Sequence, residues 1–478
     1  GRADLVVAAP FGAAGSGAGQ VYIFSGSGLT GSPVRTLTGA AAGDRFGFDV
    51  GVGNIGGDAK ADVLVGAPGV TSGNANGGAV YGFFGGGLIN GAAATPTGSN
   101  GLTLTISNSE GTVAYPNAAG DLGPSLGAAV AILGDVNADG RNDYFVAVPG
   151  LNAASLVDVG ESYVGFGQTS YPGSSIGVGT LATPGMGFRT QSEQTNDSEG
   201  FTAAASGDVN GSGGADLVIA DARLGSVVVR FGDVTPSGTT TQNSDLTGGN
   251  GVRLFSSEAN ARFGESIAVG DINNDGRADI MVGAPGAGGD GKVYVLLGAA
   301  SYAGASIDVA NPSGGTVIEI DGSGGFGTSV AFIGDFNGDG RGDFAVGAPT
   351  DGASGSAYIM LGSAAPSAGA FALASSANVI KLSGGAAGTG IDVAGPGDLN
   401  GDGRADVAIG AANDGSNSNG AVYVVYGRSV QTSSAVGQEM LALSDGSNDI
   451  FGGDAASGAI MFDAPMASND LPPPELFI

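Results

Sequence analysis

One loop, repeated along the chain, limits what this protein can fold into. Its clearest copy spans residues 334–343 (Gly-Asp-Phe-Asn-Gly-Asp-Gly-Arg-Gly-Asp) and precedes the apolar run at 344–349 (Phe-Ala-Val-Gly-Ala-Pro). Counting from Asp335, oxygen-bearing side chains stand at positions 1, 3, 5 and 9, and a Gly stands at position 6. Alternate side chains of a tight loop turn towards one centre, and a Gly at the bend tolerates positive φ. The loop followed by an apolar run therefore predicts an oxygen-lined turn that leads into a buried strand.

The same unit recurs at regular intervals. Position 1 of the loop falls at residues 135, 208, 271, 335 and 398, in steps of 73, 63, 64 and 63 residues. A degraded copy begins at Asn54 and has Gly56 at position 3, where the other copies carry an oxygen. Repeats of a strand-rich unit are typical of a modular β architecture.

The loop residues are the types that bind a hard cation. Ca²⁺ prefers six to eight oxygen ligands, and calcium loops supply them at this kind of spacing. We expect side-chain oxygens from positions 1, 3, 5 and 9 and a backbone carbonyl from position 7. The four complete loops supply Asp135, Asn137, Asp139, Arg141 and Asp143; Asp271, Asn273, Asp275, Arg277 and Asp279; Asp335, Asn337, Asp339, Arg341 and Asp343; and Asp398, Asn400, Asp402, Arg404 and Asp406.

Two further loops are less complete. The loop of Asp208, Asn210, Ser212, Gly214 and Asp216 has Ser where the others have Asp at position 5, and it is predicted as a further, weaker calcium site. The loop with Asn54, Asp58 and Asp62 loses one side-chain oxygen and is the poorest candidate.

The composition excludes several classes of function. The formal net charge is −29, which disfavours nucleic acid and anionic membranes as partners. The chain has no Cys and no His, so disulfides, thiolate zinc sites, Cys nucleophiles and His-based triads are excluded. The sequence contains no run of 18 apolar residues and therefore predicts no membrane-spanning segment. Every cluster of acids is accounted for by a loop, so we expect no enzymatic activity.

Counting strands predicts seven units. The third strand of the unit appears seven times, from Val21-Tyr22 to Val422-Tyr423, whereas the loop-bearing first strand appears six times. Residues 451–462 begin with Phe-Gly like a repeat and are expected to supply the missing strand by pairing with residues 3–8. We therefore predict one domain over residues 1–462, whose first blade is shared between 1–45 and 451–462. Residues 463–478 are predicted to form an extended, Pro-containing tail.

Phe-Gly, the Asp-rich loop and Gly-Ala-Pro, in this order, resemble the FG-GAP repeats of integrin α-subunit propellers and their bacterial relatives. The resemblance covers roughly residues 1–462. It implies an all-β, seven-bladed β-propeller of four-stranded antiparallel blades, with calcium loops on one face and ligands on the opposite face or on a partner subunit. The absence of Cys points to a bacterial or other non-animal secreted relative rather than to an integrin.

Two functions remain open at this stage, and a third is less favoured. The first is a calcium-binding extracellular or cell-surface module for adhesion or protein interaction, whose partner is another protein or a cell-surface component. The second is a structural subunit of a surface layer or filament that assembles with itself. The third is the non-catalytic domain of a secreted hydrolase.

Overall fold

The structure is a computed structural model. It describes residues 2–11, 17–26, 33–58, 60–71, 77–85, 101–105, 125–149, 161–169, 175–191, 203–221, 224–232, 246–304, 306–312, 315–367, 371, 373, 378–383, 388–411, 421–429 and 441–443.

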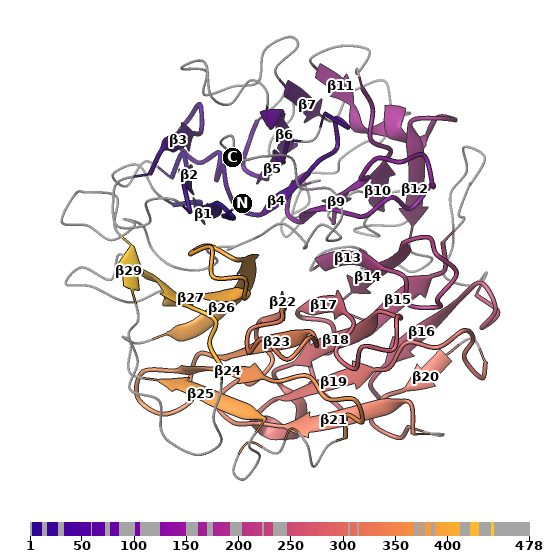
Figure 1. The fold of residues 1–478 in the computed structure, drawn as a ribbon. Helices are drawn as coiled ribbons and strands as arrows, with labels where there is room; N and C mark the ends of the chain where they lie inside the picture. Colours follow the sequence, from indigo (N-terminus) through magenta and orange to yellow (C-terminus); the bar gives the residue numbers. More distant parts are fainter. Residues whose placement is uncertain are drawn as a thin grey trace.

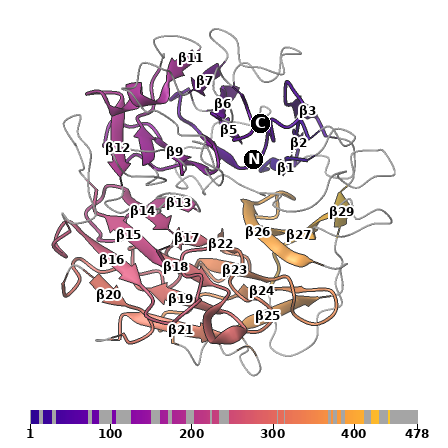
Figure 2. The same cartoon turned by 180° about the vertical axis from the view of Figure 1, so that it is seen from behind.

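Seven β-sheets follow one another around a ring, which runs clockwise in Figure 1 and is seen from behind in Figure 2. We call the sheets blades 1 to 7 in chain order. Blade 1 contains β1 (Leu5–Ala9), β2 (Gln20–Phe24) and β3 (Arg35–Thr38); blade 2 contains β4 (Val50–Gly53), β5 (Asp62–Ala67), β6 (Ala79–Phe83) and β7 (Gly101–Thr105); blade 3 contains β8 (Val130–Ile132), β9 (Tyr144–Val148), β10 (Glu161–Gly165) and β12 (Gly187–Gln191); blade 4 contains β13 (Ala203–Gly207), β14 (Asp216–Asp221), β15 (Ser226–Arg230) and β16 (Gly251–Phe255). Blade 5 contains β17 (Ile267–Gly270), β18 (Asp279–Ala284), β19 (Lys292–Leu296) and β21 (Val317–Asp321); blade 6 contains β22 (Val330–Gly334), β23 (Asp343–Ala348), β24 (Ser356–Met360) and β25 (Val379–Ser383); blade 7 contains β26 (Thr389–Gly397), β27 (Asp406–Ala411), β28 (Ala421–Val425) and β29 (Leu441–Leu443).

Neighbouring strands within each blade are antiparallel, with two additions. Strands β11 (Ser175–Gly177) and β20 (Ser306–Asp308) pair in parallel with the outer strands β7 and β16 and give blades 2 and 4 a fifth strand. The described helices are two short 3₁₀ turns, Val178–Ala182 and Ala287–Gly289. In the described part of the chain, no helix has the length and apolarity needed to cross a membrane.

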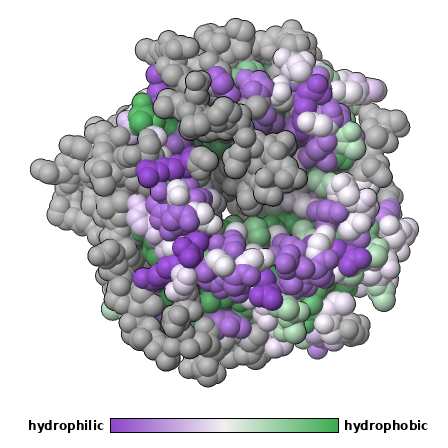
Figure 3. All heavy atoms as spheres, in the orientation of Figure 1, coloured by the Kyte–Doolittle hydropathy of each residue, from purple (hydrophilic) through white to green (hydrophobic). Residues whose placement is uncertain are grey.

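The second strand of each repeat lies deep in its blade, as its apolar run predicts. All six residues of β18, β23 and β27 are buried, and so are all five of β9. Such strands have blades packed on both faces and therefore lack the alternation of a half-exposed strand. The large apolar side chains that are exposed among the described residues are Val34, Leu224 and Tyr426. On the face shown in Figure 3, a band of hydrophilic residues crosses the lower half of the ring.

The described residues form seven apolar core clusters, and each cluster lies between two adjacent blades. One of them joins blade 1 to blade 7: Leu5 and Phe24 pack with Leu399, Ala408 and other residues of blade 7. The Ala3 N–H also donates to the Asp398 carbonyl at 2.8 Å. The ring is thus closed by packing between the first and last blades.

The seven-bladed, all-β propeller predicted from the repeats is confirmed. In the described residues blade 1 has three strands, β1 to β3, close to the segments predicted for its second, third and fourth strands. The predicted first strand at 451–462 and the predicted tail at 463–478 lie outside the described residues.

Candidate metal-binding loops

All the oxygen-rich loops join the first strand of a blade to the second. The four complete loops connect β8 to β9, β17 to β18, β22 to β23 and β26 to β27, and the loop with Ser212 connects β13 to β14. Because the blades are arranged alike around the ring, these connections lie on the same face of the propeller. The Gly at position 6 has positive φ in each complete loop, for example +88° at Gly140 and +84° at Gly340, as the sequence predicts.

Positions 1, 3 and 5 form an oxygen-lined turn. In the loop of blade 3, the N–H of Asp139 donates to Oδ1 of both Asp135 and Asn137, at 2.9 Å each. The other Asp135 oxygen accepts the Gly140 N–H at 2.6 Å. The loops of blades 5, 6 and 7 repeat these contacts, with the N–H of position 5 shared between positions 1 and 3. The sequence-predicted ligands of these three positions are therefore brought together.

The Asp at position 9 has a second role, which the sequence did not predict. Asp143 is fully buried; its Oδ2 accepts the N–H of Val136 in its own loop at 2.9 Å, and its Oδ1 accepts the N–H of Gly167 at 3.0 Å. The carboxylate fastens the loop to the end of the third strand. Among the described residues, no three Asp or Glu side chains are arranged so that together they could hold a metal ion. Position 9 remains a predicted metal ligand and is also a structural fastener.

The fastener occurs in all seven blades. In each blade a Gly two residues beyond the third strand donates its N–H to the position-9 Asp. The pairs are Gly26–Asp4, Gly85–Asp62, Gly167–Asp143, Gly232–Asp216, Gly298–Asp279, Gly362–Asp343 and Gly427–Asp406. A Cβ at Gly26 would lie 1.9 Å from the Ala3 carbonyl oxygen, so a side chain does not fit there. A Gly recurs two residues after the third strand of every blade, and this sequence pattern could have predicted the Gly–Asp pairs.

Burial raises the pKa of these fastener carboxyls. The pKa of Asp143 and of Asp343 rises to about 7, and neighbouring loop acids such as Asp139 add to the effect. Backbone N–H donors act in the opposite direction but do not compensate for the lost hydration. A cation bound in the loop would favour the charged form of the fastener carboxyl.

The donor set fits calcium. Two Asp and one Asn line each complete turn, every donor atom is an oxygen, and a buried carboxyl with a raised pKa lies directly behind them. The position-7 carbonyl predicted as a ligand belongs to Arg141, whose own N–H donates to Asp139 Oδ1 at 3.0 Å.

The two incomplete loops keep part of this arrangement. In blade 4 the N–H of Ser212 donates to both Asp208 and Asn210 at 2.8 Å, so the turn is preserved with a hydroxyl at position 5. In blade 2, Asp62 keeps its fastener bonds to Ile55, Gly56 and Gly85. In blade 2 the position-9 Asp thus still anchors the loop, although the set of predicted metal ligands is incomplete there.

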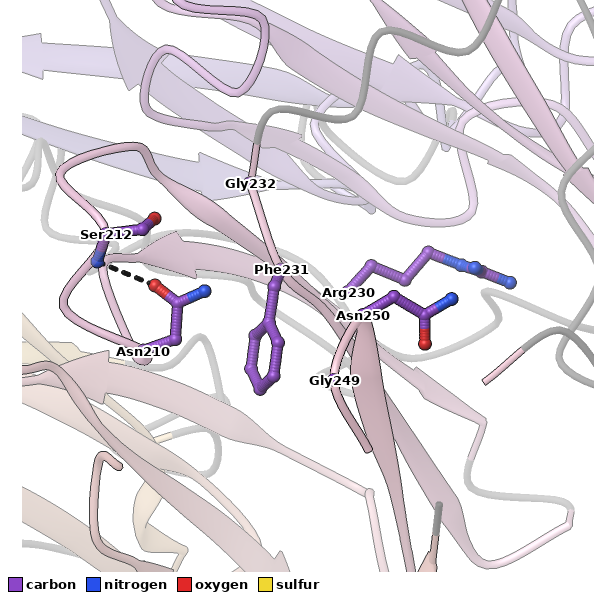
Figure 4. A pocket seen from close by; sticks show the side chains of 7 residues that line it. All are labelled: Asn210, Ser212, Arg230, Phe231, Gly232, Gly249 and Asn250. Carbon is purple, nitrogen blue, oxygen red and sulfur yellow. Dashed lines mark hydrogen bonds between the residues drawn. The ribbon is translucent and has the colours of Figure 1, made fainter. Parts of the chain in front are cut away.

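A cavity of about 330 Å³ adjoins the loop of blade 4 (Figure 4). It is lined by Asn210, Ser212, Arg230, Phe231, Gly232, Gly249 and Asn250. In the view of Figure 4, the Phe231 ring lies between the two loop side chains and the side chains of Arg230 and Asn250. The cavity therefore adjoins two predicted ligands of the blade 4 loop.

Comparison with known proteins agrees with this geometry. The family model of the FG-GAP repeat matches residues 263–296, 326–360 and 391–425, which cover the first three strands of blades 5, 6 and 7 almost completely. Blades 5, 6 and 7 each contain an FG-GAP repeat. Blades 1 to 4 lie outside the matched residues, and their membership in the ring follows from the structure.

Three relatives illustrate the similarity of this chain to larger proteins. Integrin alpha-3 of Mus musculus is 41% identical over 111 residues, which is 22% of this chain and 10% of the integrin. Integrin alpha-PS2 of Drosophila melanogaster is 35% identical over 108 residues, 21% of this chain and 7% of that protein. Phosphatidylinositol-glycan-specific phospholipase D of Rattus norvegicus is 37% identical over 114 residues, 22% of this chain and 13% of the phospholipase. The chain thus spans about a tenth of the length of these relatives.

Proposed function

We propose that this chain is a calcium-stabilised propeller that acts outside the cell as an adhesion or protein-interaction module. The observation that carries the proposal is the recurrence of one oxygen-lined turn on one face, held in each blade by a buried Asp. Similarity to two integrin α subunits supports the interaction role. The phospholipase activity in the name of the third relative belongs to a protein of which this chain spans 13%.

Calcium would be held by positions 1, 3, 5 and 9 and by the position-7 carbonyl of blades 3, 5, 6 and 7, with blade 4 as a further site. When bound, the ion supplies the positive charge that these acid-rich loops need. The chain's own residues pre-shape the turn: Asp135 and Asn137 both accept the N–H of Asp139, and Asp143 anchors the loop from behind. A site pre-shaped in the folded state stabilises that state when the ion binds.

The test is thermal unfolding in excess calcium and in EDTA, with magnesium as the matched control ion. A site that exists only in the folded state contributes RT ln(1 + [L]/Kd), about 2.7 kcal/mol at a hundredfold excess over Kd. We expect a large fall in Tm in EDTA, reversed by calcium but not by magnesium, because calcium tolerates irregular oxygen shells better. Identical melting curves in calcium and EDTA would refute the calcium role.

The interaction role is tested separately. Electron microscopy of native material distinguishes free particles, which support an interaction module, from an ordered array. An array would instead support the alternative of a structural subunit that assembles with itself.

A further inference from the structure

The residue at position 7 of the loop reaches out of its own blade. It is Arg or Lys in six of the seven blades: Arg2, Lys60, Arg141, Arg277, Arg341 and Arg404. In four cases the side chain lies against the Gly at position 4 of the loop in the preceding blade. A Cβ built on Gly57 would lie 3.2 Å from Nε of Arg141, and the corresponding distances are 2.9 Å for Gly211 and Arg277, 2.9 Å for Gly338 and Arg404, and 3.0 Å for Gly401 and Arg2.

Arg404 shows how the contact is built. Its guanidinium is held within blade 7, by Ser429 Oγ at 3.1 Å and by Asp402 of its own loop at 4.0 Å. Its Nε is buried without a hydrogen-bond partner and faces the backbone of the preceding loop. The side chain therefore links position 5 of its own loop to position 4 of the loop before it.

Backbone contacts strengthen the same junction. The Ala405 N–H donates to the carbonyl of Asp335 at 3.0 Å, and the Arg428 N–H donates to the carbonyl of Phe336 at 2.9 Å. Asp335 is a predicted ligand, so any shift of that loop on binding an ion moves the groups that blade 7 contacts. The bond to position 1 recurs from Ala278 to Asp208 at 2.9 Å and from Ala3 to Asp398 at 2.8 Å.

One junction lacks a basic residue at position 7. At position 7 of the blade 4 loop the chain has Gly214 instead of Arg, and at position 4 of the blade 3 loop it has Ala138 instead of Gly. Ala138 has φ of +60°, so the turn keeps its shape without the arginine above it. The chain thus contains an internal control in which two adjacent loops lack the arginine contact.

We propose that the position-7 arginines act as clamps that couple each metal loop to the loop of the preceding blade. Ion binding in one blade then alters the ion affinity of its neighbour, and the coupling is interrupted between blades 3 and 4. The clamp of Arg2 on Gly401 carries the coupling across the closure of the ring. This inference rests on the proposed calcium function.

The experiment is a double-mutant cycle on the calcium-induced rise in Tm. The variants Asp335→Ala and Asp398→Ala remove one ligand from the loops of blades 6 and 7, singly and together. We expect the double variant to lose less of the calcium-induced rise than the sum of the single losses, because coupled sites are weakened by either change. Adding Arg404→Met should make the two losses additive.

The control pair is Asp135→Ala with Asp208→Ala, across the junction that lacks an arginine. We expect these losses to be additive. Additive losses in the blade 6 and 7 pair, coupling that survives Arg404→Met, or equal coupling in the control pair would each overturn the inference. If Arg404→Met does not fold, Arg404→Lys replaces it and should give a reduced coupling.

The inference can fail independently of the calcium function. If wild-type protein shows no calcium-induced rise in Tm, the proposed function fails. The clamp is then tested in EDTA by a double-mutant cycle, in which Tm is measured for Arg404→Met, for Asp335→Ala and for the two changes combined. Non-additive Tm losses would support the clamp, and additive losses would refute it.

Discussion

The fastener role of the position-9 Asp leads to a prediction that separates it from a simple metal ligand. Asp343 is fully buried, and it accepts the N–H groups of Phe336 at 2.9 Å and Gly362 at 2.7 Å. Both bonds are buried. Asp343→Ala leaves the Gly362 N–H without a partner, whereas the Phe336 N–H keeps its bond to the Gly334 carbonyl at 3.1 Å. A buried unsatisfied donor costs about 1–3 kcal/mol. We therefore expect the variant to lose about 1–3 kcal/mol of unfolding free energy in EDTA, where no ion is bound.

Asp335→Ala is the matched control in the same loop. Its N–H partners at positions 4, 5 and 6 are exposed and can bond to water instead, so in EDTA its cost should stay below about 1 kcal/mol. In excess calcium the same variant should also lose the linkage free energy of one site, about 2.7 kcal/mol at a hundredfold excess over Kd. Asp343→Asn keeps one acceptor oxygen and should lie between Asp343→Ala and the wild type.

The assay is urea unfolding followed by far-UV circular dichroism, in EDTA and in calcium, for all three variants. We expect Asp343→Ala to lower the unfolding free energy in both media. We expect Asp335→Ala to lower it substantially only in calcium. If Asp343→Ala in EDTA is as stable as Asp335→Ala, the buried carboxylate is not a fastener.

Three further predictions concern other parts of the molecule. Asp335→Ala should remove one bound calcium, whereas Asn54→Ala should remove none; native mass spectrometry of both variants counts the ions, and equal losses would contradict the ranking of the loops. Deleting residues 451–478 should yield unstable or aggregated protein if they complete blade 1, whereas deleting 466–478 should be tolerated; a longer deletion that is monomeric with unchanged Tm would refute this closure. Burial raises the pKa of Asp49 from 3.8 to about 7, so the folded state holds this proton more tightly and stability should fall as pH rises between these values. Asp49→Asn should reduce that slope in urea unfolding at several pH values, while fastener carboxyls such as Asp143 and Asp343 account for the remainder. An unchanged slope would refute the contribution of Asp49.

Much of the fold could be predicted from the sequence, because its strongest signals are local and repeated. The loop at 334–343 specifies its own turn: Asp335 and Asn337 have short side chains that bond to backbone a few residues away, and Gly340 supplies the positive φ. The apolar run that follows the loop is buried because adjacent blades pack on both faces of the blade that contains it. Repetition of this unit at intervals near 63 residues then predicts a modular ring.

Other features were decided by contacts between segments far apart in the chain. Asp143 was predicted only as a ligand because nothing near it in sequence shows that Gly167, 24 residues later, donates to it. The packing of Leu5 and Phe24 on Leu399 depends on bringing the two ends of the ring together, which no local pattern encodes. Sequence thus determined the turns, the strands and their number, since these depend on neighbouring residues. Tertiary structure alone decided what holds each loop to its blade and each blade to the next, because those contacts exist only after the ring has closed.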